Sequence, residues 1–474
     1  MRNNRYAILA LTLLLPGCTM APKYERPAAP VPDNWAVTHM GKPAGSPQAQ
    51  SRTAGSLASI KWREYFVDSQ LQRLIELALA NNRDLRVAAL NIEKSRAQYQ
   101  IKRADLLPTI NATGSGTVQR IPASLSSSGR ATISRQYNVN LGMSAYELDF
   151  FGRVQSLKDQ ALEQYLATEH AKRSAQTSLV AEVASSYLTL AADRERLKLA
   201  RDTYDSQLAS YQLIQRRFEV GASSELDLRQ AQTGVESARV DVARYTSLVA
   251  QDQNALAVVI GMPVPSELFP EKLSEVVTVK ELQPGLPSEL MQRRPDILQA
   301  EGMLKAANAN IGAARAAFFP KVTLNTNIGT SSDQLAKLFA PGSAAWLFAP
   351  QISVPIFDTG RNIAGLKVSE VERDIALAQY EKAIQNAFRE VSDALTQKGT
   401  LVEQINAQKA LTEATSESYR LAEARYKAGI SSYLYVLDSQ RSFYSASQSL
   451  ISTNLSRLVN LVTLYKVLGG SDDV

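Results

Sequence analysis

The chain has 474 residues, of which 45% are hydrophobic and 21% charged, so it is long enough for two or more domains and apolar enough to fold around a core. Its 52 basic and 46 acidic residues are interspersed without a basic run, which argues against a nucleic-acid partner because such binding needs clustered positive charge. One cysteine excludes an intramolecular disulfide, and two histidines leave little for a metal site or for acid–base catalysis.

Residues 1–17 have the pattern of a secretory signal peptide. Two arginines precede an apolar stretch, residues 6–15, that is too short to cross a bilayer as a helix. The leucine-proline-glycine-cysteine run at 15–18 resembles the lipobox of bacterial lipoproteins, although proline is unusual at its place. The resemblance implies that Cys18 is acylated and becomes the first mature residue; a chance cysteine after an ordinary signal is the alternative.

The acylated N-terminus and an extended tether are predicted over residues 18–56, which are rich in proline, alanine, glycine and serine. A short structured segment follows at 57–83. No stretch of about 18 apolar residues occurs after the cysteine, so a membrane crossing by this chain requires strands rather than a helix.

From residue 84 onward the chain matches itself, which predicts two copies of one structural unit. Helical segments that end before Pro108 and Pro320 align at an offset of 212, and Gly221 aligns with Gly429 at an offset of 208. Repeat 1 is predicted to span 84–261 and repeat 2 to span 296–469, with a linker at 262–295 and a C-terminal tail at 470–474.

Each repeat carries a predicted β-hairpin after its first helix, at about 109–148 and about 321–357. From Tyr137 to Ala145 apolar and polar residues alternate, which is typical of a strand with one apolar and one polar face. In the second hairpin the alternation extends through Val354 and Ile356, although two prolines weaken that strand. Four strands in two hairpins are therefore expected.

A very long helix is predicted after each hairpin. No proline or glycine interrupts the stretch between Gly152 and Gly221, and its apolar residues recur at alternating spacings of three and four, which is typical of a coiled coil. The second repeat continues this pattern through Leu395, Val402 and Ile405. At 1.5 Å per residue each helix is about 100 Å long, and a shorter helix returns from the glycine at its end.

Four strands cannot seal a cylinder in a membrane. An open sheet leaves unsatisfied backbone groups at its edges, which lipid does not tolerate. The smallest transmembrane barrels have about eight strands, so at least two chains must pool their hairpins. The alternative is a small soluble β-subdomain beneath the coiled coil, and the strands themselves do not fix the number of copies.

Several motifs spread over nearly the whole mature chain carry a family resemblance. They are Trp62–Asp68, the segment at 71–82, Leu286–Leu290, Arg293–Ile297, the segment at 306–309 and Arg315–Pro320. These motifs resemble the lipoprotein outer-membrane factors of resistance–nodulation–division efflux systems, of the TolC/OprM type and NodT-like; Ser69, where relatives often have proline, is a small departure. The resemblance implies a homotrimer with a twelve-stranded transmembrane β-barrel, four strands from each chain, continued by a twelve-helix periplasmic α-barrel. It also implies an equatorial belt of shorter segments, to which 57–83 and the linker at 262–295 are assigned.

The same resemblance implies the function of a passive exit duct in a tripartite multidrug or solvent efflux pump, lipid-anchored in the outer membrane. Its implied partners are a periplasmic adaptor and an inner-membrane resistance–nodulation–division pump, reached directly or through the adaptor. No cofactor is expected beyond the acyl lipid, and no enzyme activity, since no nucleophile, base or metal-ligand cluster is present among the motifs. Ducts for type I secretion or metal efflux are alternatives, as is a periplasmic adaptor lipoprotein, which would carry one helical hairpin rather than a duplication.

The glycine turns at the far ends of the long helices are predicted to form a periplasmic tip. The resemblance makes this tip the docking region for the adaptor. The candidate docking residues are Arg217, Phe218, Gly221, Arg425, Tyr426 and Gly429. Simple helix termination also explains the two glycines, because glycine readily adopts the left-handed backbone that ends a helix.

The segment Tyr433–Arg441 resembles the gate of the same family. The resemblance implies that Asp438 of each copy contributes to a ring of carboxylates at the pore constriction, with Leu434 forming an apolar ring one turn below. Asp438 and Arg441 are three residues apart, so they lie on one helix face and can pair; a solvated surface ion pair is the alternative interpretation. The aligned residue of the first repeat is Gln230, so the repeats differ at this point.

Overall fold

The computed structural model describes residues 19–32, 35, 61–273 and 293–470. Cys18, most of the tether and much of the linker lie outside the described residues. The chain forms two compact units. The sheet unit comprises Met1–Ala28, Asn91–Glu169 and Gln299–Tyr380, and the helical unit comprises Ala29–Leu90, His170–Leu298 and Glu381–Val474.

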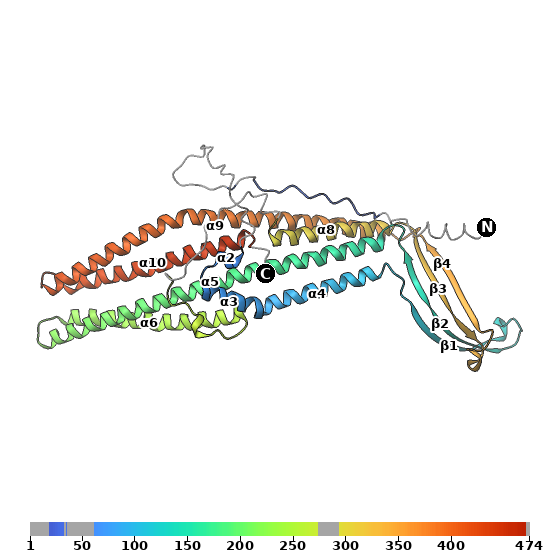
Figure 1. Ribbon diagram of the computed structural model, residues 1–474, viewed down its shortest axis with the longest axis horizontal. Coiled ribbons are helices and arrows are strands. Elements are labelled where there is room, and N and C mark those ends of the chain that lie inside the picture. Colours follow the sequence, from blue (N-terminus) through green and yellow to red (C-terminus); the bar gives the residue numbers. More distant parts are fainter. Residues whose placement is uncertain (1–18, 33–34, 36–60, 274–292, 471–474) are drawn as a thin grey trace. The chain divides into compact units, whose positions relative to one another are not determined.

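One order of elements occurs twice along the chain (Figure 1). After the short helices α2 (Trp62–Tyr65) and α3 (Ser69–Asn81), the first series is α4 (Arg83–Ala104), β1 (Asn111–Ile121), β2 (Thr132–Leu148), α5 (Arg153–Glu219) and α6 (Glu225–Ile260). The second series is α8 (Pro295–Ala316), β3 (Lys321–Ser332), β4 (Ala344–Ser353), α9 (Arg361–Lys427) and α10 (Tyr433–Val467). The predicted long helices are confirmed, since α5 and α9 have 67 residues each.

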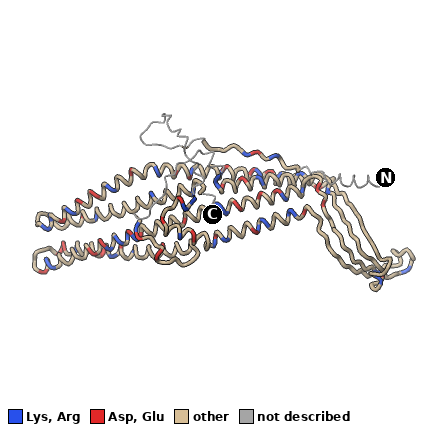
Figure 2. The backbone as a smooth tube through the Cα atoms, viewed as in Figure 1, with Lys and Arg blue, Asp and Glu red and all other residues tan. Residues whose placement is uncertain are grey.

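The four strands form one antiparallel sheet in the order β1-β2-β3-β4. Leu141, Ile328 and Trp346 lie side by side across β2, β3 and β4, and all three are exposed on one face. The polar side chains of the same strands point to the other face, because successive residues of a strand alternate. Figure 2 shows that charged residues are sparse along these strands.

Two local features of the sheet differ from the predicted strands. A β-bulge between Met143 and Tyr146 places Ala145 at φ 54, and the Ala145 backbone N–H donates to Asn325 Oδ1 at 2.7 Å. The predicted continuation of the last strand through Val354 and Ile356 is wrong. β4 ends at Ser353, which pairs with the first residue of β3, so the residues beyond it have no partner strand.

Each long helix begins in the same way. Gly152 and Gly360 adopt positive φ angles of 70° and 84°, which turn the chain from the sheet into the helix. Asp149 Oδ1 then accepts from the backbone N–H of Arg153 at 2.7 Å, and Asp358 Oδ2 accepts from that of Asn362 at 2.9 Å. The first N–H groups of a helix have no partner within the helix, so these carboxylates stabilise both starts.

The core of the helical unit lies where α2 and α3 pack against α5, α6 and α10. Tyr65 is fully buried, stacks on Tyr465 at 4.9 Å between ring centroids and donates to the carbonyl oxygen of Leu461 at 2.6 Å. Tyr187 of α5 is also buried and donates to Asp68 Oδ2 at 3.2 Å. Buried aromatic side chains with satisfied hydroxyls thus fix these short helices to the long ones.

The apolar seam of α9 shifts by one residue from the predicted pattern. Val402, predicted on the buried face, is 60% exposed, whereas Leu401 and Ile405 are buried. Leu401 and Ile405 are four residues apart and therefore share one helix face, whereas Val402 is turned by about 100° from Leu401. None of the helices in the described ranges has both the length and the apolar character needed to cross a bilayer.

Candidate functional site

Two helical hairpins in the helical unit end in turns of the same geometry. Gly221 and Gly429 have φ angles of 75° and 74°, at the ends of α5 and α9. In the first turn the Ala222 N–H donates to the Arg217 carbonyl at 2.7 Å, and in the second the Ile430 N–H donates to the Arg425 carbonyl at 2.9 Å. Both are Schellman caps, which need a left-handed residue and therefore glycine.

The two hairpins contact each other directly beside these turns. Arg217 Nη1 donates to the Tyr426 hydroxyl at 3.2 Å, and the guanidinium lies 5.4 Å from the centre of the Tyr426 ring. The Tyr426 ring also lies against that of Tyr433 at 5.3 Å. The structure thus brings two predicted docking residues, Arg217 and Tyr426, into contact, while Phe218 and Arg425 are exposed.

The first turns of α10 have one buried and one exposed face. The buried side chains are Tyr433, Val436, Leu437 and Gln440, and the first three pack with Ile214 and Ala231 of the other hairpin. Burial raises the pKa of Tyr433 to about 12. The predicted gate residues Leu434, Asp438 and Arg441 all lie on the exposed face.

The ion pair that the spacing of Asp438 and Arg441 allows is not formed. Among the residues that the structure describes, no salt bridge joins the two side chains, although both are exposed on one face of α10. An exposed pair gains little electrostatic energy in water, so spacing alone does not decide whether it forms: Glu417 and Arg420 of α9 have the same spacing, are also exposed and do form a salt bridge. The Asp438 carboxylate is therefore available to groups outside the chain.

Further polar contacts between the hairpins begin at Gln440 and continue along α10. Gln207 Nε2 of α5 donates to Gln440 Oε1 of α10 at 2.7 Å, and both side chains are buried. The Tyr444 hydroxyl of α10 donates to Asp241 Oδ2 of α6 at 2.9 Å, and burial together with this carboxylate raises the pKa of Tyr444. Buried hydrogen bonds are costly to leave unmade, so they fix the register of α10 against α5 and α6.

Exposed apolar residues beside the turn glycines were missed by the sequence interpretation. Val220 is 78% exposed and Ile430 is 67% exposed, and Leu226 of α6 is exposed as well. A large apolar side chain beside a turn glycine is the signal that identifies them, because turns in contact with water rarely need one. Clustered apolar side chains on a protein surface are typical of an interaction site.

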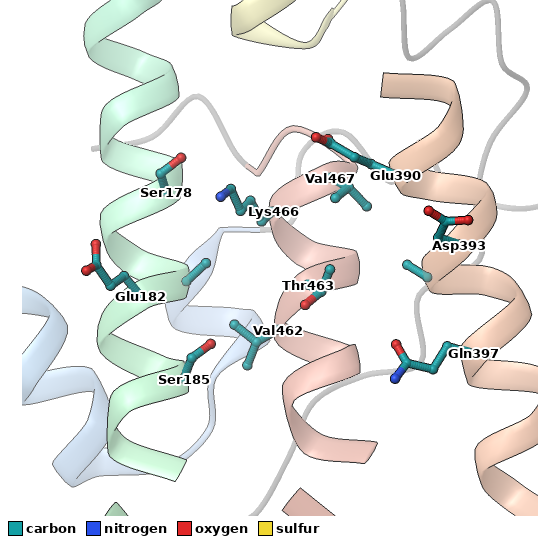
Figure 3. A pocket seen from close by; sticks show the side chains of 12 residues that line it. Ser178, Glu182, Ser185, Glu390, Asp393, Gln397, Val462, Thr463, Lys466 and Val467 are labelled. Carbon is teal, nitrogen blue, oxygen red and sulfur yellow. The ribbon is translucent and has the colours of Figure 1, made fainter. Parts of the chain in front are cut away.

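A cavity of about 520 Å³ lies in the helical unit between α5, α9 and the end of α10 (Figure 3). Glu182, Asp393 and Lys466 line it together with serine, threonine and glutamine side chains. Alanine and valine side chains, among them Val462 and Val467, complete its lining, so the cavity is of mixed character. The cavity contains none of the predicted gate or docking residues. The two turns at Gly221 and Gly429, with the helix ends beside them, therefore remain the better candidate site.

The comparisons with known proteins decide the family. Residues 74–262 and 286–470 match the family described as outer membrane efflux protein. The chain belongs to this family. It is 49% identical over 470 residues to the toluene efflux pump outer membrane protein TtgC of Pseudomonas putida. The matched region covers 99% of this chain and 96% of TtgC.

Solved structures give the same result. The crystal structure of a membrane protein from Pseudomonas aeruginosa is 43% identical in sequence, with a TM-score of 0.89. The superposed region covers 96% of this chain and 98% of the Pseudomonas aeruginosa chain. The open state of the Neisseria gonorrhoeae MtrE outer membrane channel is 39% identical with a TM-score of 0.84, with the same coverage. The predicted family and function are confirmed: this outer membrane efflux protein is the outer-membrane channel component of an efflux pump.

Proposed function

We propose that three copies of this chain form one continuous duct, with a twelve-stranded barrel in the outer membrane and a twelve-helix barrel in the periplasm. The observation that carries the proposal is the open sheet: among the described residues, β1 and β4 each pair on one side only. Their free backbone groups must be satisfied inside a bilayer, and identical neighbours can supply the missing strands. The number three follows from the resemblance to TolC/OprM-type channels.

The two faces of the sheet support its placement in lipid. Leu141, Ile328 and Trp346 are 53%, 67% and 78% exposed in the single chain, an arrangement that lipid would cover. The charged residues of the strands are Arg120, Arg135, Glu147 and Lys321. All four lie toward strand ends, which leaves the middle of every strand free of charge.

An exposed apolar stripe on α9 supports contact between copies. Val368, Val371 and Ile375 are 56%, 42% and 53% exposed and follow one another at spacings of three and four residues. Residues at this spacing lie on one face of a helix. A neighbouring helix of a second copy would bury this face in the assembled duct.

Contacts of the N-terminal strap, residues 19–28, support a lipid anchor at Cys18. Within the sheet unit the Thr19 hydroxyl lies 3.1 Å from that of Ser156, shortly after the end of β2. Further along, Arg26 and Tyr24 donate to the buried carboxylate of Glu301 on α8. With the described strap beginning beside the start of α5, an acyl chain on Cys18 would enter the periplasmic leaflet near the base of the strands.

The exposed face of α10 supports a gate at the tip. In a threefold assembly each copy would contribute Asp438 and Leu434 to the pore, which gives a ring of carboxylates beside an apolar ring. A ring of acidic side chains favours cations. Since Gln230 takes the aligned place in the first repeat, the two hairpins line the constriction differently, and the second hairpin carries the charge.

The partners and cargo follow from the tip and from the family. The exposed apolar residues Val220 and Ile430 offer a docking surface for a periplasmic adaptor, through which an inner-membrane pump would deliver its substrates. TtgC is named for toluene efflux, so apolar solvents and antibiotics are the proposed cargo. The duct carries no catalytic step in this scheme.

The assembly is tested by the mass of the detergent-extracted protein, measured by light scattering with the bound detergent subtracted. We expect three times the mass of one mature chain, and a band on an unheated denaturing gel that converts to the single chain on heating. Lipid-facing strands also require detergent for solubility. A single chain that stays in solution without detergent would rule out the barrel.

The gate is tested by the conductance of single channels in planar bilayers. Replacing Asp438 by alanine removes the carboxylate ring, so the conductance of the channel should rise and its preference for cations should fall. Gln230→Ala, at the aligned position of the first repeat, is the matched control and should leave the cation preference unchanged. Equal selectivity of wild type and Asp438→Ala would show that this residue does not line the constriction.

A further inference from the structure

A pair of carboxyl groups lies between α5 and α6 in the helical unit. Asp193 of α5 is buried, with 5% of its surface exposed. Asp252 of α6 faces it within hydrogen-bonding reach, and in the described part of the chain its buried Oδ2 atom has no donor from any other group. Two ionised carboxylates offer only acceptors to each other, so this contact lacks a hydrogen unless one carboxyl is protonated.

The surroundings of the pair link three helices. Arg196 Nη1 donates to Asp193 Oδ1 at 2.6 Å, and its Nη2 donates to the hydroxyl of Ser452 on α10 at 2.8 Å. The charged groups that act on Asp252 are Asp193 and Arg196, both from α5, while α10 contributes the uncharged Ser452. One turn further along, Leu197, Ala200 and Tyr245 pack α5 against α6. The site is therefore part of a packed helix junction.

We propose that Asp193 and Asp252 form a proton-binding site whose occupancy sets how firmly α5, α6 and α10 are held together. Arg196 is already engaged by Asp193 and Ser452, so a proton is the remaining donor that can join the two carboxyl groups. With the proton bound, the carboxyl of one residue donates to the carboxylate of the other. Without it, two negative charges oppose each other across the α5–α6 contact.

The proton leaves within the range of pH values that the periplasm can reach. Burial, reinforced by the negative charge of Asp193, raises the pKa of Asp252 from 3.8 to about 6. A raised pKa means that the folded protein holds this proton more tightly than the unfolded chain does. The stabilising contribution of the pair is therefore complete below about pH 4 and is lost as the pH rises through about 6.

Loss of the proton has a consequence for the gate, which rests on the proposed function. The α5–α6 hairpin contacts the gate-bearing hairpin at Arg217 and Tyr426, and Arg196 connects the carboxyl pair to α10. Repulsion between Asp193 and Asp252 would loosen these connections. The tip should therefore open more often at neutral pH than at acidic pH.

The proton itself is tested by infrared difference spectroscopy of the detergent-solubilised full-length protein between pH 5 and pH 7.5. Wild type should show the carbonyl stretch of a protonated carboxyl that disappears with a midpoint near pH 6. Asp252→Asn should lose this band, because the amide mimics the protonated acid and does not titrate. Asp202→Asn, an exposed carboxylate of α5, is the matched control and should keep it.

A second variant covers the case in which Asp252→Asn fails to fold. Asp193→Asn removes the neighbouring negative charge and keeps Asp252, so the band should remain while its midpoint shifts below pH 6. Absence of a titrating band in wild type, or an unchanged midpoint in Asp193→Asn, would overturn the proton-binding site.

The link to the gate is tested separately by single-channel recordings at the same two pH values. Wild type should spend more time open at pH 7.5 than at pH 5, and Asp252→Asn should show the closed behaviour of pH 5 at both. Open times independent of pH, together with a titrating infrared band, would overturn the link to the gate. Absence of any pore at either pH would instead count against the proposed duct, and the infrared result would still decide the proton site.

Discussion

The two return helices, α6 and α10, begin at turns of the same backbone geometry but are secured in different ways. At the start of α6 the Asp227 N–H donates to Ser224 Oγ at 3.1 Å, and the Ser224 N–H donates to Asp227 Oδ2 at 3.3 Å, which is a complete capping box. At the start of α10 the corresponding Ser432 makes no side-chain cap hydrogen bond. The start of α6 is therefore stabilised by its own residues.

The start of α10 depends on the other hairpin instead. Tyr433 is 3% exposed and packs with Ile214 of α5 and Ala231 of α6, whereas the aligned Glu225 of the first repeat is exposed. A helix end held by tertiary contacts moves when those contacts move. The second hairpin, which carries the proposed gate residues, therefore takes its position from its neighbour, an arrangement that would suit a gate that responds to partners.

The largest expected effect comes from removing the buried ring at the start of α10. Tyr433→Ala should lower the free energy of local opening of residues 433–441 by about 3–5 kcal/mol, because truncating a buried aromatic side chain loses its transfer energy and leaves a cavity. Hydrogen–deuterium exchange of this segment measures the change. Glu225→Ala, at the aligned and exposed position of the first hairpin, should have little effect. Similar losses at both sites would show that the two helix starts are held alike.

The sequence was sufficient for features that depend on local residue chemistry. The long helices follow from uninterrupted spacing, the strands from alternation, and the two turns from Gly221 and Gly429. The strand end at Ser353 was not predictable from alternation, because a strand needs a pairing partner and the partner strand begins at Lys321. The exposure of Val402 likewise depends on which face of α9 packs against its neighbours.

The contacts of the candidate site could not be predicted from the sequence, and its assignment as a gate stays a prediction. A motif resemblance points to Asp438, but the three-residue separation from Arg441 permits an ion pair without deciding whether it forms, since Glu417 and Arg420 have the same spacing and do pair. The contact between Arg217 and Tyr426 joins residues from different hairpins. Packing between distant segments decides such contacts, and neither residue carries a local signal for it.

A smaller effect is expected from removing the side-chain cap of α6. Ser224→Ala removes the side-chain acceptor of the capping box, so the free energy of local opening of the first turn of α6 should fall by about 1 kcal/mol. Ser432→Ala should leave the first turn of α10 nearly unchanged, because that serine makes no cap hydrogen bond. Hydrogen–deuterium exchange of both turns in the same samples gives the two values side by side. Equal losses in the two turns would mean that Ser432 caps α10 after all. They would contradict the conclusion that α6 is held by its own cap and α10 by contacts with the other hairpin.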